Sequence, residues 1–187
     1  MESPVAQFQN NILHFYSKAD DLPENPYGLP VNTAKVLSNF TRCDRPIVLK
    51  VSSRRTVKIP TVEHAYQLQK CLESCKSEAQ RSDCLEKFLS PDTDSKKAKK
   101  LGKSFLKAYQ LETPDYWDDV KVARMRELVF QRIRASRDLQ SILQIIAVHR
   151  LRLVHLSQLD VFWGATVREC RAEGEEGTLT IQGSESQ

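Results

Sequence analysis

The spacing of hydrophobic residues changes near residue 60, from the short apolar runs typical of strands to the wider repeat of helices. Before that point, residues 12–16 form an apolar and aromatic run that predicts a strand. Residues 20–30 are rich in Pro, Asn, Asp and Gly and predict a loop. Two β-branched runs, 47–51 and 56–59, are separated by a short polar segment, which predicts a β-hairpin.

After residue 60 the pattern predicts helices. Thr61 can cap a first helix over residues 61–76, and residues 85–89 indicate a shorter helical piece. Asp94 can cap a third helix, in which four apolar residues recur at helical spacing: Ala98, Leu101, Phe105 and Ala108. The lysines of this segment then occupy the outer side of that helix.

Two more helices and a last strand complete the expected elements. Pro114 and Asp115 open a helix with one predicted buried stripe: Val122, Met125, Val129 and Ile133. Residues 139–146 predict another helix, and residues 151–156 partly alternate, which predicts a strand. The expected fold class is mainly α (α+β), a compact helical domain with a small N-terminal β-hairpin or sheet. We expect a flexible lead-in at 1–11, the single domain at 12–166 and a disordered acidic tail at 167–187.

Composition places the chain among ordinary globular proteins, with 187 residues, 40% hydrophobic and 28% charged. The net charge of +4 is too small to identify a nucleic-acid binder, although residues 96–107 hold a lysine run without any acid. The start of the chain lacks a signal-sequence pattern, and no apolar run approaches membrane length. We therefore expect a cytoplasmic or nuclear location and no membrane contact.

The five cysteines are odd in number and irregularly spaced, which argues against a disulfide framework. Cys71 and Cys75 lie at i and i+4 on the first predicted helix, a spacing that can hold a metal. No second pair with the spacing of zinc ligands follows, and the four histidines are scattered. We therefore expect no metal and no other cofactor.

A polar line runs along the first predicted helix. Glu63, Gln67 and Lys70 are spaced i, i+4 and i+7, so their side chains project from one face. A carboxylate, an amide and an ammonium in a row are typical of the floor of a site. The backbone amides of Val62 and Glu63, at the start of this helix, offer a seat for a phosphate. The alternative is a solvated Glu-Lys face without a function.

Aromatic residues lie close to acids at both tryptophans of the chain. Trp117 is followed by Asp118, and Trp163 follows Asp160. A flat ring stacks on a base while a carboxylate stabilises positive charge on a sugar, so this combination suits a nucleotide-like ligand. The alternative is that both tryptophans are anchors of the hydrophobic core.

Five segments occur in order along the chain: Phe15-Tyr16-Ser17, Leu37-Ser38-Asn39-Phe40, Pro60 through Lys70, Tyr116-Trp117 with Lys121, and Asp160-Val161-Phe162-Trp163-Gly164. Together they resemble the YbiA/NADAR family, which is named for its link to NAD and ADP-ribose. The resemblance covers residues 13–164, and the segment around Glu63 is its most specific part. It implies a YbiA-like fold, helical with a little β structure.

The resemblance also implies N-glycosidase activity, the cleavage of the bond between a base nitrogen and C1 of a ribose. The implied substrates are ADP-ribosylated guanine, free or in a nucleic acid, and small nucleotide-like intermediates of the riboflavin pathway. It implies catalytic roles for Glu63, Lys70 and Asp160. Lys70 would act either by charge or as an attacking amine. Contacts with the substrate are expected from Asn39, Phe40, Tyr66, Gln67, Trp117 and Trp163.

The sequence departs from the family pattern after Gly164. Family members usually continue with an acidic, glycine-rich loop and a closing helix, and both are expected to be missing here. A catalytically degenerate module that binds ADP-ribose or a nucleotide is therefore the alternative to an enzyme. A third hypothesis is weak nucleic-acid contact through the lysines of residues 96–107. The alternative to this hypothesis is that these lysines form a solvated helix face without a partner.

Overall fold

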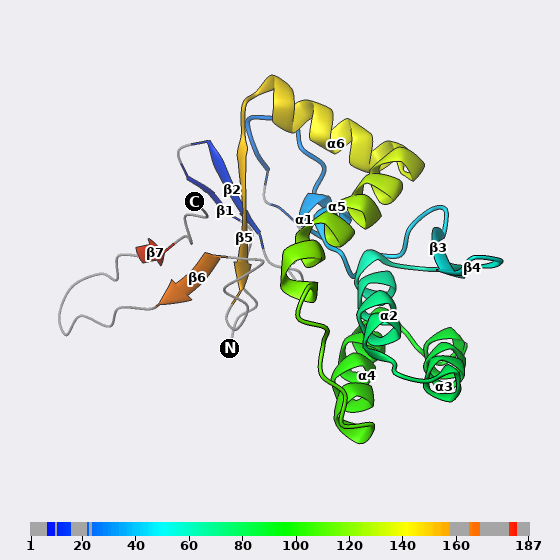
Figure 1. Cartoon of the computed structure of the whole chain (residues 1–187). Coiled ribbons are helices and arrows are strands. Elements are labelled where there is room, and N and C mark those ends of the chain that lie inside the picture. The colour runs from blue at the N-terminus through cyan, green and yellow to red at the C-terminus, as the bar shows by residue number, and fades with distance from the viewer. Residues whose placement is uncertain are drawn as a thin grey trace. The chain divides into compact units, whose positions relative to one another are not determined.

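The computed structural model describes residues 7–9, 11–15, 22, 24–157, 165–168 and 180–182 (Figure 1). The chain divides into two units. We call residues 39–140 the helical unit, and residues 1–38 together with 141–187 the sheet unit. The described residues contain six helices and two sheets, so the expected mainly α (α+β) class is confirmed.

The helical unit begins with the expected hairpin, formed by β3 (Ile47–Ser52) and β4 (Arg55–Ile59). The two strands are antiparallel, and Ile47 lies opposite Ile59. Burial alternates along β3, where Ile47, Leu49 and Val51 are buried and the residues between them are exposed. One face of the hairpin is therefore part of the core, as the β-branched pattern requires.

Four helices follow in the same unit: α2 (Val62–Ser74), α3 (Glu78–Leu89), α4 (Ser95–Ala108) and α5 (Trp117–Ala135). α2 contacts the other three (Figure 1). The N-termini of α2, α3 and α4 are capped by the side chains of Thr61, Ser77 and Asp94. These caps satisfy amides that have no partner within the helix, which fixes where each helix starts.

Two helices of the helical unit differ from the sequence prediction, and α1 (Thr33–Leu37), outside this unit, was not predicted. α3 is longer than the piece expected at residues 85–89, because Ser77 and Gln80 form a capping box that starts it at Glu78. In α5 the side chain of Val122 is 49% exposed, although it was expected in the buried stripe. Met125 is buried as expected, whereas Val129 and Ile133 are only half-buried. The buried residues of α5 are Trp117, Met125, Leu128 and Arg132. α5 carries its own apolar residues on several sides. The face that is buried is therefore selected only by packing against α2 and β3.

The sheet unit contains a five-stranded sheet in the order β1-β2-β5-β6-β7. The strands are β1 (Gln7–Gln9), β2 (Ile12–Phe15), β5 (Arg152–Ser157), β6 (Ala165–Arg168) and β7 (Thr180–Gln182). β2 and β5 are parallel neighbours, and both were expected as strands. Three short strands were not predicted from the sequence: β1 lies in the expected lead-in, β6 spans the expected boundary between domain and tail, and β7 lies in the expected acidic tail.

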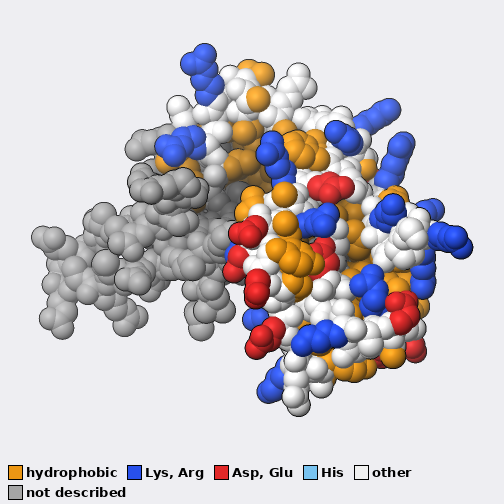
Figure 2. Space-filling model, in the orientation of Figure 1, with side chains coloured by type: hydrophobic (Ala, Val, Ile, Leu, Met, Phe, Trp, Pro, Cys, Tyr) orange, Lys and Arg blue, Asp and Glu red, His pale blue; other side chains and the backbone are white. Residues whose placement is uncertain are grey.

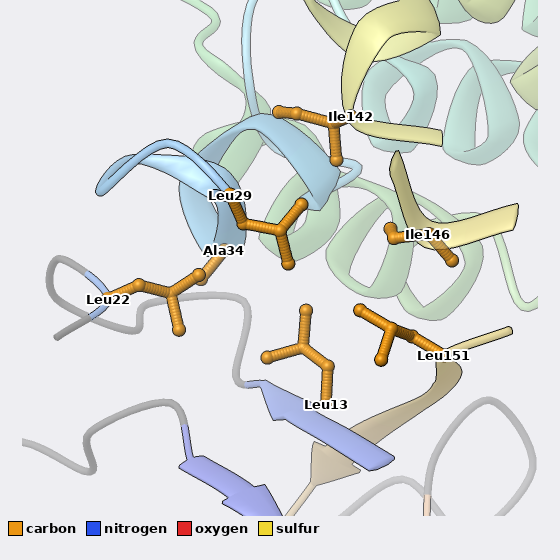
Figure 3. Packing of buried hydrophobic residues seen from close by; sticks show 7 residues of the cluster. All are labelled: Leu13, Leu22, Leu29, Ala34, Ile142, Ile146 and Leu151. Atoms are coloured by element: carbon orange, nitrogen blue, oxygen red, sulfur yellow. The ribbon is translucent and has the colours of Figure 1, made fainter. Parts of the chain in front are cut away.

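Helices α1 (Thr33–Leu37) and α6 (Arg137–Val148) contribute to the core of the sheet unit. α6 begins in the helical unit, and its residues from Ser141 onward belong to the sheet unit. Figure 3 shows buried side chains from β2, the loop after it, α1, α6 and the residue before β5 converging in one cluster: Leu13, Leu22, Leu29, Ala34, Ile142, Ile146 and Leu151. No helix in the described part of the chain combines the length and apolar character needed to cross a membrane.

Candidate functional site

The first turn of α2 is held from two sides. Thr61 accepts a hydrogen bond from the amide of His64 at 3.1 Å, and the amide of Glu63 donates to the carbonyl of Asn39 at 3.0 Å. Asn39 and Glu63 are far apart in sequence, so the fold brings the two expected segments together. The amide of Glu63, which was expected to help bind a phosphate, already donates to the carbonyl of Asn39. That part of the expectation is therefore wrong.

The carboxylate of Glu63 is held by an amide one turn along the same helix. Nε2 of Gln67 donates to Oε1 of Glu63 at 3.0 Å, and Glu63 is only 7% exposed. The other end of the Gln67 amide faces α4, where a Cβ placed on Gly102 would lie 2.5 Å from Oε1 of Gln67. Any residue larger than glycine at 102 would therefore displace the amide that orients Glu63.

Gly102 was not among the residues expected at the site. It is buried within α4, and its carbonyl also accepts a long contact from Sγ of Cys71 at 3.7 Å. Glycine in a helix interior costs about 1 kcal/mol relative to alanine, so its presence inside the lysine-rich helix was the available sequence signal. Because Gly102 has no side chain, α2 and α4 can approach each other closely beside Gln67.

The segment Asn39-Phe40 lies between two helices of the same unit. Nδ2 of Asn39 contacts Sδ of Met125 on α5 at 3.8 Å, and the carbonyl of Phe40 accepts from Oγ of Ser95 at the start of α4. Nζ of Lys99 lies 5.7 Å from the centre of the Phe40 ring. Phe40 is half-buried, so an aromatic edge with a cation over it lies beside the segment that contacts Glu63.

Tyr66 and Trp117 face each other in the core. Their ring centres are 5.6 Å apart with the planes tilted by 48°, and they are 6% and 3% exposed. A base can stack only on an aromatic face that solvent can reach. This packing favours the alternative offered for Trp117, an anchor of the hydrophobic core, and places Tyr66 beside it.

Lys70 completes the polar line of α2 but lies apart from Glu63. The two residues are two turns apart, about 10 Å along the helix axis. In the described part of the chain, the ion pairs within 4.0 Å do not include Lys70, which is half-buried. Gln67 therefore contacts the Glu63 carboxylate, and Lys70 forms no ion pair with it in the described part of the chain.

His64, the neighbour of Glu63 in sequence, contacts α3 through its side chain. Its Nε2 lies 2.8 Å from the carbonyl oxygen of Phe88, and because a carbonyl only accepts, Nε2 carries the hydrogen. Burial lowers the pKa of His64, so the ring is neutral at pH 7. His64 thus ties α2 to a carbonyl in the last turn of α3, one of the carbonyls that a helix leaves without a partner.

Asp160 and Trp163, the other expected site residues, lie outside the described residues. Within the described ranges, no three His, Cys, Asp or Glu side chains gather as metal ligands.

A hollow of about 660 Å³ lies on the helical unit, and it is lined by α5 residues that include Val122, Arg126 and Phe130. None of the candidate residues lines this hollow. We base the site on the contacts of Glu63, because an open hollow along one helix offers no convergent chemistry.

Taken together, the arrangement provides one oriented, nearly buried carboxylate, with the Phe40 ring on the neighbouring segment and the ammonium of Lys99, from α4, over that ring. In the comparison with protein families, the family model described as the NADAR domain matches residues 15–183. The match includes the segments of Asn39, Glu63 and Trp117, and it extends beyond residue 166, where the sequence prediction ended the domain. No curated protein and no solved structure matched the chain.

Proposed function

Because the chain belongs to the NADAR family, which is known generally as N-glycosidase-like, we propose that it hydrolyses an N-glycosidic bond between a base nitrogen and C1 of a ribose. The proposed substrates are ADP-ribosylated guanine or a related nucleotide or riboflavin-pathway intermediate. The observation that carries the proposal is the carboxylate of Glu63, held by Gln67 on a helix start that is tied to Asn39.

The chemistry requires a carboxylate in a fixed position. As the bond to the base breaks, positive charge develops on C1 and the ring oxygen of the ribose. In the proposed reaction Glu63 lies against C1, where it stabilises that charge or takes a proton from the attacking water. The hydrogen bond from Gln67 keeps the carboxylate in one orientation, so no reorganisation is needed when charge develops.

The remaining roles are proposed from the family resemblance, from solvent exposure and from position along α2. Asp160 is proposed as the second carboxyl group, which protonates the leaving nitrogen, on the family resemblance alone. Phe40 replaces Trp117 as the proposed stacking partner for a base, because Phe40 is half-buried and Trp117 is 3% exposed. Lys70 is proposed to bind a substrate phosphate by charge, since its distance along α2 suits a group beyond the ribose.

Replacing Glu63 by Gln is the test. The protein is incubated with ADP-ribosylated guanosine and, separately, with a phosphorylated aminopyrimidine intermediate, and release of the base is followed by chromatography. We expect Glu63→Gln to lower turnover about 10²- to 10⁴-fold, the usual contribution of a positioned acid or base. Glu86→Gln is the matched control, because it makes the same chemical change at an exposed position of α3.

Two outcomes would contradict the proposal. Unchanged turnover in Glu63→Gln would remove Glu63 from the catalytic role. Binding of ADP-ribose by calorimetry, with no base released from either substrate by the native protein, would favour the binding module instead of the enzyme.

A further inference from the structure

The lysines of α4 form a single row on the helix surface. Lys96, Lys100, Lys103 and Lys107 are spaced i, i+4, i+7 and i+11, and all four are exposed. With Lys99 they fall within an arc of about 100° around the helix axis, and the row is about 16 Å long. The opposite side of α4 is buried, with Ala98 and Phe105 at 0% and 2% exposure.

In the described structure these lysines form no ion pair within 4.0 Å, and the nearby carboxylate is Asp94, whose pKa is lowered by backbone hydrogen bonds and by the charges of Lys97 and Lys96. The ion pairs found there within 4.0 Å involve other cations, namely Arg81, Lys87, Lys121 and Arg124. On the face of the molecule in Figure 2, acidic and basic side chains are interspersed, whereas α4 contains six lysines and no acid. Like charges one turn apart destabilise a helix by about 0.2–0.5 kcal/mol per pair, so the row costs stability unless an anion covers it.

The row is connected to the candidate site at the start of α4. Ser95 donates to the carbonyl of Phe40, and Lys99 lies over the Phe40 ring. Phe40 follows Asn39, whose carbonyl binds the amide of Glu63. A linear ligand bound along the row therefore meets an aromatic ring at the end that is closest to the catalytic carboxylate.

We propose that the lysine row of α4, defined as Lys96, Lys99, Lys100, Lys103 and Lys107, binds the phosphates of a single-stranded nucleic acid. A row of cations beside an aromatic ring is the combination that binds single strands without sequence preference. A membrane surface fits poorly, because a helix at a membrane buries its apolar side in the lipid, and the apolar side of α4 lies in the core. This surface goes beyond the glycosidase chemistry, since it binds strands that carry no modified base.

Binding is measured by fluorescence anisotropy with a labelled, unmodified 12-nucleotide strand at several salt concentrations. Four to five phosphate contacts give a slope of log affinity against log salt of about −3, a loss of about 60-fold between 50 and 200 mM salt. The test variant is Lys100→Glu/Lys107→Glu. The matched control is Lys50→Glu/Lys58→Glu, which makes the same change in net charge at exposed positions of the hairpin.

We expect the α4 variant to lower affinity by at least about tenfold and to flatten the salt slope, while the hairpin variant changes affinity less than about threefold. Equal losses in both variants would overturn the proposal, because binding would then follow net charge alone. Equally tight binding of polyglutamate of the same length would also overturn it, since the row would then be a site for acidic polypeptides. Circular dichroism verifies that both variants are folded.

The same experiment separates this proposal from the proposed function. Glu63→Gln leaves the strand affinity unchanged, because Glu63 is not part of the row. Lys100→Glu/Lys107→Glu leaves turnover of a free nucleoside substrate unchanged. If the Glu63→Gln variant is folded but no longer binds the strand, the candidate site and the lysine row are not distinct. That result would overturn the assignment of strand binding to α4.

Discussion

Two lines of polar side chains on the contacting helices α2 and α4 have the same sequence spacing but differ in solvent exposure. Glu63, Gln67 and Lys70 on α2 are buried or half-buried, whereas Lys96, Lys100 and Lys103 on α4 are exposed. In the first line Gln67 donates to Glu63. In the second line every side chain is a cation, so none can accept a hydrogen bond from another. Polar side chains along a helix can therefore be buried when they include both hydrogen-bond donors and acceptors, whereas side chains that are all donors stay in water.

Gly102 separates the two lines, since it lies on α4 on the side that faces Gln67. The helix therefore presents its smallest residue to the site and its longest cationic side chains to solvent. We therefore expect mutations in the lysine row to leave Glu63 in place, whereas a larger residue at 102 would reach Glu63 through the Gln67 amide. The predictions below test this division of the two helices.

The largest effect is expected from Leu68→Ala, because Leu68 on α2 is fully buried at 0% exposure. Removing it leaves a cavity beside the polar line, and we expect a loss of about 2–5 kcal/mol in the free energy of unfolding. Lys103→Ala on the exposed row should change stability by less than about 0.5 kcal/mol. Urea unfolding measures both. A similar loss in the two variants would contradict the contrast between a packed helix and a solvated row.

A smaller effect, confined to activity, is expected from Gly102→Ala. The added Cβ meets the end of the Gln67 side chain, which can move, so stability should stay within about 1 kcal/mol. The displaced amide no longer holds Glu63, and we expect turnover to fall about tenfold or more, the scale of one hydrogen bond to a charged group.

Gln67→Ala gives the comparison for Gly102→Ala. It should lower the turnover number by the same factor, and Gly102→Ala/Gln67→Ala should be no worse than Gln67→Ala alone. Steady-state kinetics separate kcat from KM, and the loss is expected in kcat. If the two losses multiply in the double variant, Gly102 does not act through Gln67.

The smallest effects are expected at the two helix caps. Thr61 caps α2 and Asp94 caps α4, where Oδ1 accepts from the amide of Lys97 at 2.7 Å. Thr61→Ala and Asp94→Ala should each cost about 1 kcal/mol, measured by thermal unfolding. Only Thr61→Ala should also lower turnover, because it loosens the turn that holds Glu63. Equal losses of turnover would show that the start of α4 is as important to the site as the start of α2.

Much of the fold was predictable from local pattern. The hairpin of β3 and β4, the start of α2 at Thr61 and the cap of α4 at Asp94 follow from β-branched runs and capping residues. The start of α3 was missed because its capping box lies before the apolar residues that were used to find it. The buried face of α5 was misplaced at Val122 because apolar residues on several sides of that helix fit more than one stripe.

The sequence by itself determined the spacing of Glu63, Gln67 and Lys70 and the family resemblance, because both depend on residues that are close along the chain or ordered along it. Only the tertiary structure decided that Asn39 binds the start of α2, that Gly102 admits Gln67, and that Trp117 is buried against Tyr66. These contacts join residues far apart in sequence. Their formation depends on how the helices cross, which the periodicity of any one helix does not specify.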